Sequence, residues 1–317
     1  MLINEMLNIR YPIFQGAMAN IATASFAAAI SNAGGLGIIA TGAMDEKQTR
    51  DAIRECKKLT NKPFGVNVML MNPHTPEIMQ VIAQEKVALV TTGAGNPGPY
   101  VEMLKNSGCK IFPVVASVAL AKRLEKAGVD GLIAEGTESG GHVGETTTMS
   151  LVPQIVNAVN IPVLAAGGIA SGKQLHAALA LGACGVQIGT CLLVSEECPI
   201  HENYKKAVLR AKDLDSVVTG RSAGVPVRVL KNQMSMQYIK LEQSGAAKEE
   251  LEKLTLGGLR KAVFEGDIKR GSVMIGQVAG MCKEVLPVKT ILENMVNEAS
   301  EEMCQLTKKV KELQYES

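Results

Sequence analysis

The sequence predicts an α/β fold of the TIM type, a closed parallel (β/α)8 barrel with a smaller, mostly helical insertion after strand eight. Eight short apolar runs alternate with helix-length segments that carry Lys and Glu on one face and Ala, Leu and Val on the other. This alternation stops near residue 195, and the chain returns to the barrel near residue 271. An open doubly wound sheet would need a glycine fingerprint after the first strand, which Gln15-Gly-Ala-Met-Ala does not supply.

The elements are expected in a regular order. The first strand is expected at Pro12–Met18, a small-residue helix at Thr23–Asn32 and the second strand at Gly37–Thr41. Asp45 is expected to cap the next helix, because a carboxylate there accepts hydrogen bonds from unpaired amides. The remaining strands are expected at Phe64–Leu70, Val87–Thr92, Lys110–Ala116, Gly131–Glu135, Pro162–Ala166 and Gly185–Thr190.

Three regions follow from this pattern. Residues 1–195 form the barrel, and residues 196–270 form a charged helical lobe with no strand–helix repeat. Residues 271–317 return to the barrel and end, from Pro287, in a charged amphipathic helix. Basic residues outnumber the nearby acids Asp213 and Asp215 in the lobe, which indicates either a solvated face or a docking surface for an acidic partner. These residues are Lys205, Lys206, Arg210, Lys212, Arg221, Arg228 and Lys231.

Composition is that of an ordinary globular protein, with 46% hydrophobic and 20% charged residues among 317. The net charge of +2 and the absence of Trp argue against nucleic acid as a partner. Seven cysteines without a CxxC pair indicate free thiols in a reducing cytosol, so a cytoplasmic location is expected. Cys184, Cys191 and Cys198 are interpreted as packing residues and not as zinc ligands. The alanine-rich run Ala22–Ile30 is too short to span a bilayer, and no membrane partner is expected.

The stretch from Glu135 to Thr148 is the main candidate for chemistry. An apolar run ends at Glu135, and His142 follows within a loop that also contains four glycines. An imidazole among glycines at the carboxyl end of a strand is placed for proton transfer. The alternative is a structural loop whose His caps a carbonyl. His74 could line the same mouth, whereas His176 and His201 are expected to be structural or exposed.

Glycines at two further strand ends indicate a phosphate site. Gly167 and Gly168 follow the seventh strand, and Gly189 and Thr190 follow the eighth. Barrels often bind phosphate with the backbone amides of these two loops, although tight helix–strand packing would also select glycine. The mouth has neither a Schiff-base Lys at a strand end nor a carboxylate cluster for a metal. Its Asn67, Met18 and glycines suit a flat polar ring, so FMN is the natural candidate.

Five motifs resemble those of the nitronate monooxygenase and FMN-dependent enoyl-ACP reductase II superfamily, and the resemblance covers nearly the whole chain. They are Phe14-Gln-Gly-Ala-Met18, Asn67, Glu135-Gly-Thr-Glu-Ser-Gly-Gly-His142, Ala165-Ala-Gly-Gly-Ile-Ala170 and Gln187-Ile-Gly-Thr190. Nitronate monooxygenases more often carry Arg directly after the His, where this chain has Val143. The run up to Leu151-Val-Pro-Gln154 and the segment Met274-Ile-Gly-Gln277 are more similar to the reductase branch.

The resemblance implies a role for each matching residue. His142 would lie over the flavin ring beside the substrate, and Glu135 would hold the ribityl region or order the loop. Phosphate would be held by Gly168, Gly189 and Thr190, with Gln187 beside them. The full set of expected cofactor-binding residues is Gly16, Ala17, Met18, Asn67, Glu135, Gly167, Gly168, Gln187, Gly189, Thr190, Met274 and Gln277.

The expected activity is reduction of trans-2-enoyl thioesters on acyl carrier protein, the last step of the fatty acid elongation cycle, with FMN as cofactor and NADH or NADPH as co-substrate. A nitronate monooxygenase or an NADH:quinone reductase on the same scaffold is the enzymatic alternative. A flavin-binding protein without turnover is the alternative from another class. The resemblance also suggests a monovalent cation, for which no motif supplies ligands, and leaves a homodimer open.

Overall fold

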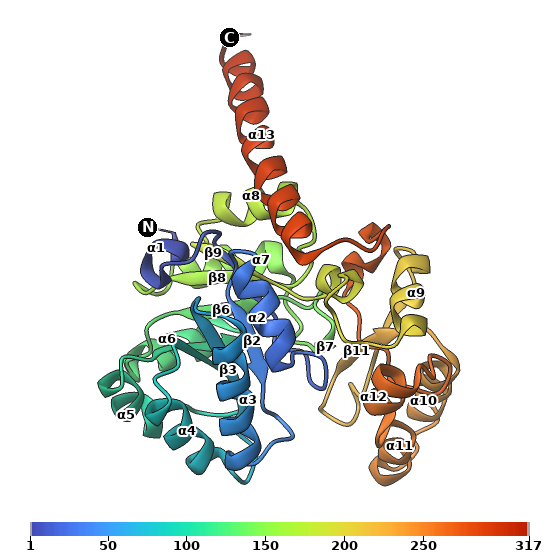
Figure 1. The fold of residues 1–317 in the computed structure, drawn as a ribbon. Helices are drawn as coiled ribbons and strands as arrows, with labels where there is room; N and C mark the ends of the chain where they lie inside the picture. Colours follow the sequence, from blue (N-terminus) through green and yellow to red (C-terminus); the bar gives the residue numbers. More distant parts are fainter. Residues whose placement is uncertain (1, 316–317) are drawn as a thin grey trace.

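Eight parallel strands form the barrel in this computed structural model, which describes residues 2–315 (Figure 1). The strand order is β1-β9-β8-β6-β5-β4-β3-β2. Hydrogen bonds from Gln15 N to Leu36 O and from Leu36 N to Ile13 O, each 2.9 Å, join β1 to β2 and close the ring. The strands are β1 Ile13–Gln15, β2 Gly37–Ala40, β3 Phe64–Met69, β4 Leu89–Gly93, β5 Lys110–Val115, β6 Leu132–Glu135, β8 Val163–Ala166 and β9 Gly185–Ile188. The predicted barrel is therefore confirmed, with most strand ends within two residues of the predicted ones.

Helices surround this barrel, and their starts follow the expected capping chemistry. Asp45 Oδ1 accepts from Gln48 N at 2.7 Å while Gln48 Oε1 accepts from Asp45 N at 3.1 Å, which confirms the predicted cap. Ser117 and Ser171 cap two later helices with their hydroxyl oxygens, which accept from Leu120 N and Gln174 N. The barrel helices are α1 Ile3–Leu7, α2 Ala24–Asn32, α3 Glu46–Leu59, α4 Thr75–Gln84, α5 Val101–Asn106, α6 Val118–Lys126, α7 Thr148–Val156 and α8 Gly172–Ala180, with the short turn η1 at Gly98–Tyr100.

Apolar side chains fill the barrel at its amino-terminal end. Phe14 and Phe112 lie with ring centroids 6.0 Å apart, and both are fully buried. A Cβ on Gly131 would lie 2.2 Å from the Phe112 ring, so only glycine leaves room for this ring. Helix α1 closes the same end, where Ile3 N donates to Cys184 O at 2.9 Å. This filling leaves the opposite, carboxyl end of the strands as the place for a site.

The insertion, predicted to be mostly helical, also contains two strands that the sequence analysis did not predict. Strands β10 (Ser216–Thr219) and β11 (Val227–Leu230) form an antiparallel hairpin, and β11 also pairs with β7 (Gly141–His142). Both runs are rich in Val, which favours extended backbone, and the loop between them turns at Gly220 and Gly224. The other elements of the insertion are α9 Glu202–Arg210, α10 Gln233–Gln243, α11 Lys248–Thr255, α12 Gly258–Arg260 and η3 Lys261–Glu265, and the short helix η2 (Thr190–Val194) precedes it.

The chain re-enters the barrel beside the point where it left. Leu286 N donates to Val194 O, and Glu196 N donates to Leu286 O. After η4 (Gln277–Met281), helix α13 (Val288–Tyr315) begins where Glu197 accepts from Val288 N at 2.9 Å. Helix α13 packs on α8 and then extends away from the body (Figure 1).

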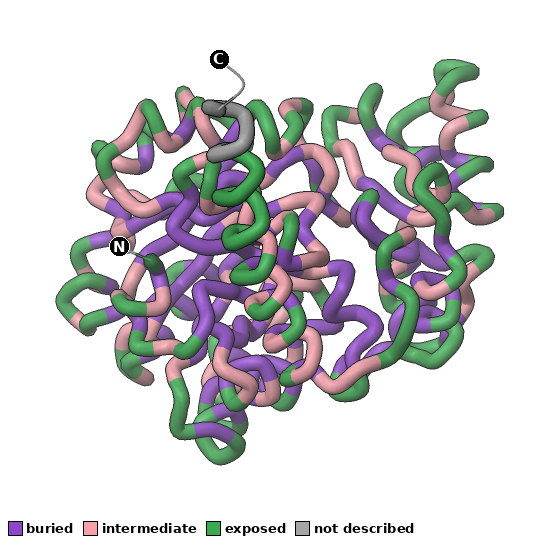
Figure 2. The backbone as a smooth tube through the Cα atoms, turned by 90° about the horizontal axis from the view of Figure 1, so that it is seen from above, coloured by how far each residue is buried: buried purple, intermediate pink, exposed green. Residues whose placement is uncertain are grey.

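Burial follows this architecture. Buried positions gather in the barrel and exposed ones along the outer part of α13 (Figure 2). Six cysteines are buried, as predicted for packing residues, and Cys304 on α13 is exposed. Within residues 2–315, none of the helices combines the length and apolarity that crossing a bilayer would require.

Candidate functional site

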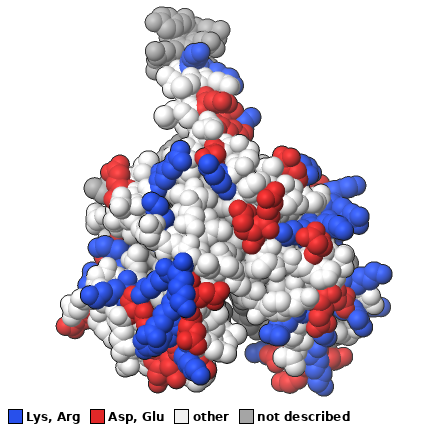
Figure 3. Space-filling model, viewed as in Figure 1, with Lys and Arg blue, Asp and Glu red and all other residues white. Residues whose placement is uncertain are grey.

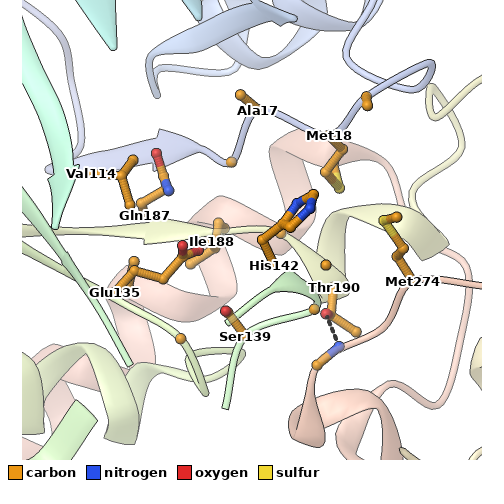
Figure 4. A pocket seen from close by; sticks show the side chains of 18 of the residues that line it. Ala17, Met18, Val114, Glu135, Ser139, His142, Gln187, Ile188, Thr190 and Met274 are labelled. Carbon is orange, nitrogen blue, oxygen red and sulfur yellow. Dashed lines mark hydrogen bonds between the residues drawn. The ribbon is translucent and has the colours of Figure 1, made fainter. Parts of the chain in front are cut away.

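A cavity of about 370 Å³ opens at the carboxyl ends of the strands (Figure 4). It brings together His142 and all predicted cofactor-binding residues except Gln277. Gly276 lines the cavity, whereas the next residue, Gln277, lines a neighbouring hollow beside α8. Residues that the sequence analysis did not single out also line the cavity, notably Glu138, Ser139 and Val114. Glu138 and Ser139 lie inside the quoted motif that ends at His142, so their position was a usable signal.

The two glycine-bearing strand ends differ in what they require. Gly167 and Gly168 have positive φ values of 92° and 70°, and a Cβ on Gly167 would lie 2.7 Å from Gly136 O. Tight packing alone therefore explains Gly167. A Cβ on Gly189 would meet only Met18 Sδ, at 3.8 Å, and would occupy cavity space. Gly189 thus gives a ligand close access to the backbone, as a phosphate site needs.

Polar side chains at the cavity have fixed orientations or lack partners. Asn67 Nδ2 donates to Thr91 Oγ1 at 2.9 Å, and Thr190 Oγ1 accepts from Gly276 N at 2.9 Å. Ser139 Oγ is buried without a hydrogen-bond partner among the described residues, and it lines the cavity. An unpaired buried hydroxyl is costly unless a ligand satisfies it. These groups suit a ligand that carries both hydrogen-bond donors and acceptors, as the ribityl chain and ring of a flavin do.

Glu135 ends β6 at one side of the cavity, near Gln187 (Figure 4). Burial disfavours the charged carboxylate and raises the pKa of Glu135 from 4.5 to about 7. The Ser139 hydroxyl, which lies near Glu135 without forming a hydrogen bond to it, lowers this pKa and offsets burial only in part. Near neutral pH the cavity therefore holds a carboxyl group that is divided between its protonated and ionised forms.

His142 lies at the other side of the cavity, next to Met18 and Met274 (Figure 4). Its backbone belongs to β7 and pairs with Val227 of β11, so its segment is part of a sheet and not the flexible loop that the glycines predicted. His142 is exposed to solvent, but the atoms packed around its ring remove part of its hydration and lower its pKa, which favours the neutral imidazole. This loss of hydration is the sole cause of that shift, with no hydrogen bond to the ring within residues 2–315. A carbonyl-capping role is therefore not supported.

Glu138 joins the His142 segment to the glycine loops. Its carboxylate oxygens accept from Thr148 N at 3.0 and 2.9 Å, at the first residue of α7. The Thr148 hydroxyl also donates to Gly167 O at 2.9 Å. A carboxylate at a helix N-terminus is stabilised by the unpaired amides there. Glu138 thereby starts α7 at Thr148.

The basic residues of the insertion do not form one surface. Lys205 and Arg228 are buried, and both donate to main-chain carbonyls. The prediction that Lys205 and Arg228 belong to an exposed cluster was wrong. The sequence does not show that a basic side chain has a buried main-chain carbonyl to donate to. The other five of the seven basic residues named from the sequence are exposed, namely Lys206, Arg210, Lys212, Arg221 and Lys231. Lys and Arg side chains gather at the edge of the molecule that carries α9 (Figure 3).

The other histidines lie outside the cavity. His74 is exposed and faces Glu46 at 3.6 Å, so it does not line the mouth. His176 is half-buried in α8, and His201 Nδ1 accepts from Asn203 N at 3.0 Å as the cap of α9. Nowhere in residues 2–315 do three or more His, Cys, Asp or Glu side chains gather as a metal-binding group.

Known proteins resemble this chain over nearly its whole length. The family profile "Nitronate monooxygenase" matches residues 1–80 and 75–298. FabK from Thermotoga maritima is 46% identical with a TM-score of 0.93, over 96% of this chain and 97% of that one. A nitroalkane oxidase from Streptomyces ansochromogenes is 27% identical with a TM-score of 0.85, over 96% of this chain and 99% of that one. A probable nitronate monooxygenase from Staphylococcus aureus is 32% identical over 95% of this chain and 98% of its own length. The chain therefore belongs to the nitronate monooxygenase family of flavin-dependent oxidoreductases.

Proposed function

We propose that this protein is an FMN-dependent enoyl-[acyl-carrier-protein] reductase that uses NADH or NADPH to reduce trans-2-enoyl thioesters. The observation that carries the proposal is the surroundings of His142 at the cavity, where Gly140 and Gly141 precede the histidine and the buried Val143, not Arg, follows it. Such a cavity suits an extended acyl chain better than a nitronate anion. The chain is 46% identical to FabK and 27% identical to the nitroalkane oxidase. The higher identity to FabK supports the reductase branch of the family over the nitronate-oxidising branch.

The residues present fit FMN. The glycine cradle at Gly189 accepts a phosphate, while Asn67, Gln187 and Ser139 offer polar groups along the cavity. Gly16, Ala17 and Met18 would lie against the ring, and Glu135 would reach the ribityl region or order the loop. Bound at these residues, FMN would supply the chemistry of hydride transfer between the nicotinamide and the β-carbon of the enoyl thioester.

His142 would hold or move the proton that the α-carbon takes up. His142 lines the cavity and is exposed to solvent, so a substrate would reach its ring. Because desolvation lowers its pKa, the ring is mostly neutral at pH 7 and needs a proton from solvent before it can act as an acid. The neutral ring also carries an N–H that can orient the thioester carbonyl.

The exposed basic residues of the insertion are proposed to dock the acidic carrier protein. Lys206 and Arg210 lie on α9, and Lys212 follows it. Arg221 is paired with Glu145, three residues beyond His142, so this surface continues towards the cavity. With enoyl carrier protein as substrate, KM should rise as salt screens these charges, whereas a short CoA thioester should respond less. Equal salt responses would leave the cluster as a solvated face.

The decisive experiment compares acceptors. The flavin is reduced anaerobically with NADH, and reoxidation is then followed with a trans-2-enoyl thioester and, separately, a quinone. The enoyl thioester should reoxidise it fastest, and steady NAD(P)H consumption would exclude a binding protein without turnover. Oxygen-dependent consumption of a nitronate without NAD(P)H would instead establish a monooxygenase, the function in the name of the Staphylococcus aureus relative. Fastest reoxidation by quinone would establish a quinone reductase.

Two further expectations remain proposals. A monovalent cation near the site would show as a dependence of activity on K⁺, Na⁺ or NH₄⁺ at constant ionic strength. A homodimer would show as twice the mass of 33.6 kDa in light scattering.

A further inference from the structure

We propose that Arg228, on strand β11 of the insertion, is a positioning residue that fixes the His142 segment at the cavity. The insertion lobe would then take part in catalysis by holding this segment, in addition to any role in docking. The inference rests on the proposed role of His142, and it adds a residue outside the cavity to that function.

The backbone on both sides of His142 is held by three consecutive residues of the insertion. His142 pairs with Val227 and Gly141 pairs with Arg228 in the antiparallel β7–β11 ladder. Val143 N donates to Pro226 O at 3.1 Å and extends the contact by one residue. The backbone of the candidate proton donor is therefore set by a strand about 85 residues further along the chain.

The Arg228 side chain holds the other end of the same segment. Its Nε and Nη2 donate to Thr137 O at 3.1 and 3.0 Å, and its Nη1 donates to Ser216 Oγ at 3.1 Å. The guanidinium thus joins the first part of the segment, just before Glu138, to strand β10. A rigid planar donor that makes two hydrogen bonds to one carbonyl leaves that carbonyl little freedom.

The acceptors of Arg228 make it unusual. The side chain is only 6% exposed, yet its partners are a carbonyl and a hydroxyl instead of a carboxylate. Burying a charge without an ion pair costs free energy, and burial indeed lowers the pKa of Arg228. The Glu138 carboxylate is near enough to oppose that shift. A neutral residue would avoid this cost, so the guanidinium is explained by what it holds in place, which is the segment from Thr137 to Val143.

Lys205 supplies a matched control. It is also a buried cation of the insertion, and its Nζ donates to Ser195 O at 2.8 Å and Glu196 O at 3.3 Å. Its acceptors lie at the start of the insertion and not in the His142 segment. A change at Lys205 should reduce stability as a change at Arg228 does, but it should leave the position of His142 unaltered.

The test uses Arg228→Lys and Lys205→Met in the FMN-loaded protein, each alone and combined with His142→Ala. Flavin affinity, flavin reduction by NADH and reoxidation by an enoyl thioester are measured separately. Arg228→Lys should slow reoxidation by about 10- to 100-fold, since misplacing a catalytic group by about 1 Å costs this much. Flavin affinity and flavin reduction should change by less than about twofold, because the glycine loops belong to other strands.

The double variants decide whether Arg228 acts through His142. In the His142→Ala background, Arg228→Lys should have no further effect on reoxidation, whereas Lys205→Met should have the same small effect in both backgrounds. Equal losses from Arg228→Lys with and without His142, or a loss of flavin binding, would overturn the proposal. So would an equally large slowing of reoxidation by Lys205→Met alone.

Failure of the proposed function would look different. If the enoyl thioester does not reoxidise the wild-type flavin but nitronate is turned over, the reductase proposal fails. The role of Arg228 is then tested by measuring nitronate turnover in the same single and double variants. If His142→Ala leaves every acceptor unaffected, the positioning proposal fails with it. Arg228→Lys keeps the charge and most of the volume, so it retains the fold better than an apolar replacement would.

Discussion

Replacing Glu135 by Gln should make the flavin-free protein more stable at neutral pH, by an amount that depends on pH. Burial raises the pKa of this carboxyl from 4.5 to about 7 in the folded state. Below pH 4.5 both the folded and unfolded chains keep the proton, so the carboxyl adds no pH dependence. Between pH 4.5 and about 7 the unfolded chain ionises first, and folding stability falls by about 1.4 kcal/mol per pH unit. Above this window the loss is complete, at up to about 3 kcal/mol.

Urea unfolding of wild-type protein and Glu135→Gln at intervals from pH 4 to pH 8.5 measures this loss. All other titrating groups are shared, so they cancel in the difference between the two curves. The variant should gain up to about 3 kcal/mol over the wild type as pH rises through the window, with most of the gain present by pH 7.5. Curves that stay parallel across the range would show that the Glu135 carboxyl has its ordinary pKa and is better solvated than the structure indicates.

Three further predictions concern the loaded enzyme. Denatured protein should release FMN, which chromatography distinguishes from FAD; release of FAD would contradict a site with room for one phosphate. His142→Ala should keep its flavin yet lose enoyl reduction by about 10²- to 10⁴-fold, the range for a lost general acid, and wild-type turnover would return His142 to a structural role. If the protonated ring is the donor, the reoxidation rate should fall as pH rises through a value below 6.5, because desolvation lowers the pKa of His142. His142→Gln should lack this limb of the pH profile, and an unchanged limb would assign it to another group.

The barrel and most of the cavity could be predicted because their signals are local. Each strand is a short apolar run, and the residues that follow it, such as Gly16 or Glu135, meet at one end of a parallel barrel whatever the details of packing. Gln277 shows the limit of this reasoning. Met274 was placed correctly, but the start of η4 turns Gln277 away to the neighbouring hollow.

What could not be predicted depends on contacts between distant residues. Strands β10 and β11 are only four residues each, so the alternation of side chains that identifies a strand in a sequence is too short to be a clear signal. Nothing near His142 in the sequence indicates that Val227 is its partner. The buried acceptors of Lys205 and Arg228 are main-chain carbonyls, which leave no complementary charge in the sequence to reveal them.

The adjacent ends of the insertion have a consequence for how such proteins diversify. Ser195 and Leu286 form a parallel bridge, so the chain leaves and re-enters the barrel at one point. The segment between them contains no barrel strand and can be exchanged as a unit, together with the cavity residues Met274 and Gly276 that it carries. The β7–β11 ladder restricts this freedom, because a lobe taken from a relative would bring a foreign strand against His142. Chimaeras that exchange residues 196–285 should therefore retain turnover only when residues 137–143 come from the same donor. The two segments should also be inherited together, although more than 50 residues of barrel separate them in the chain.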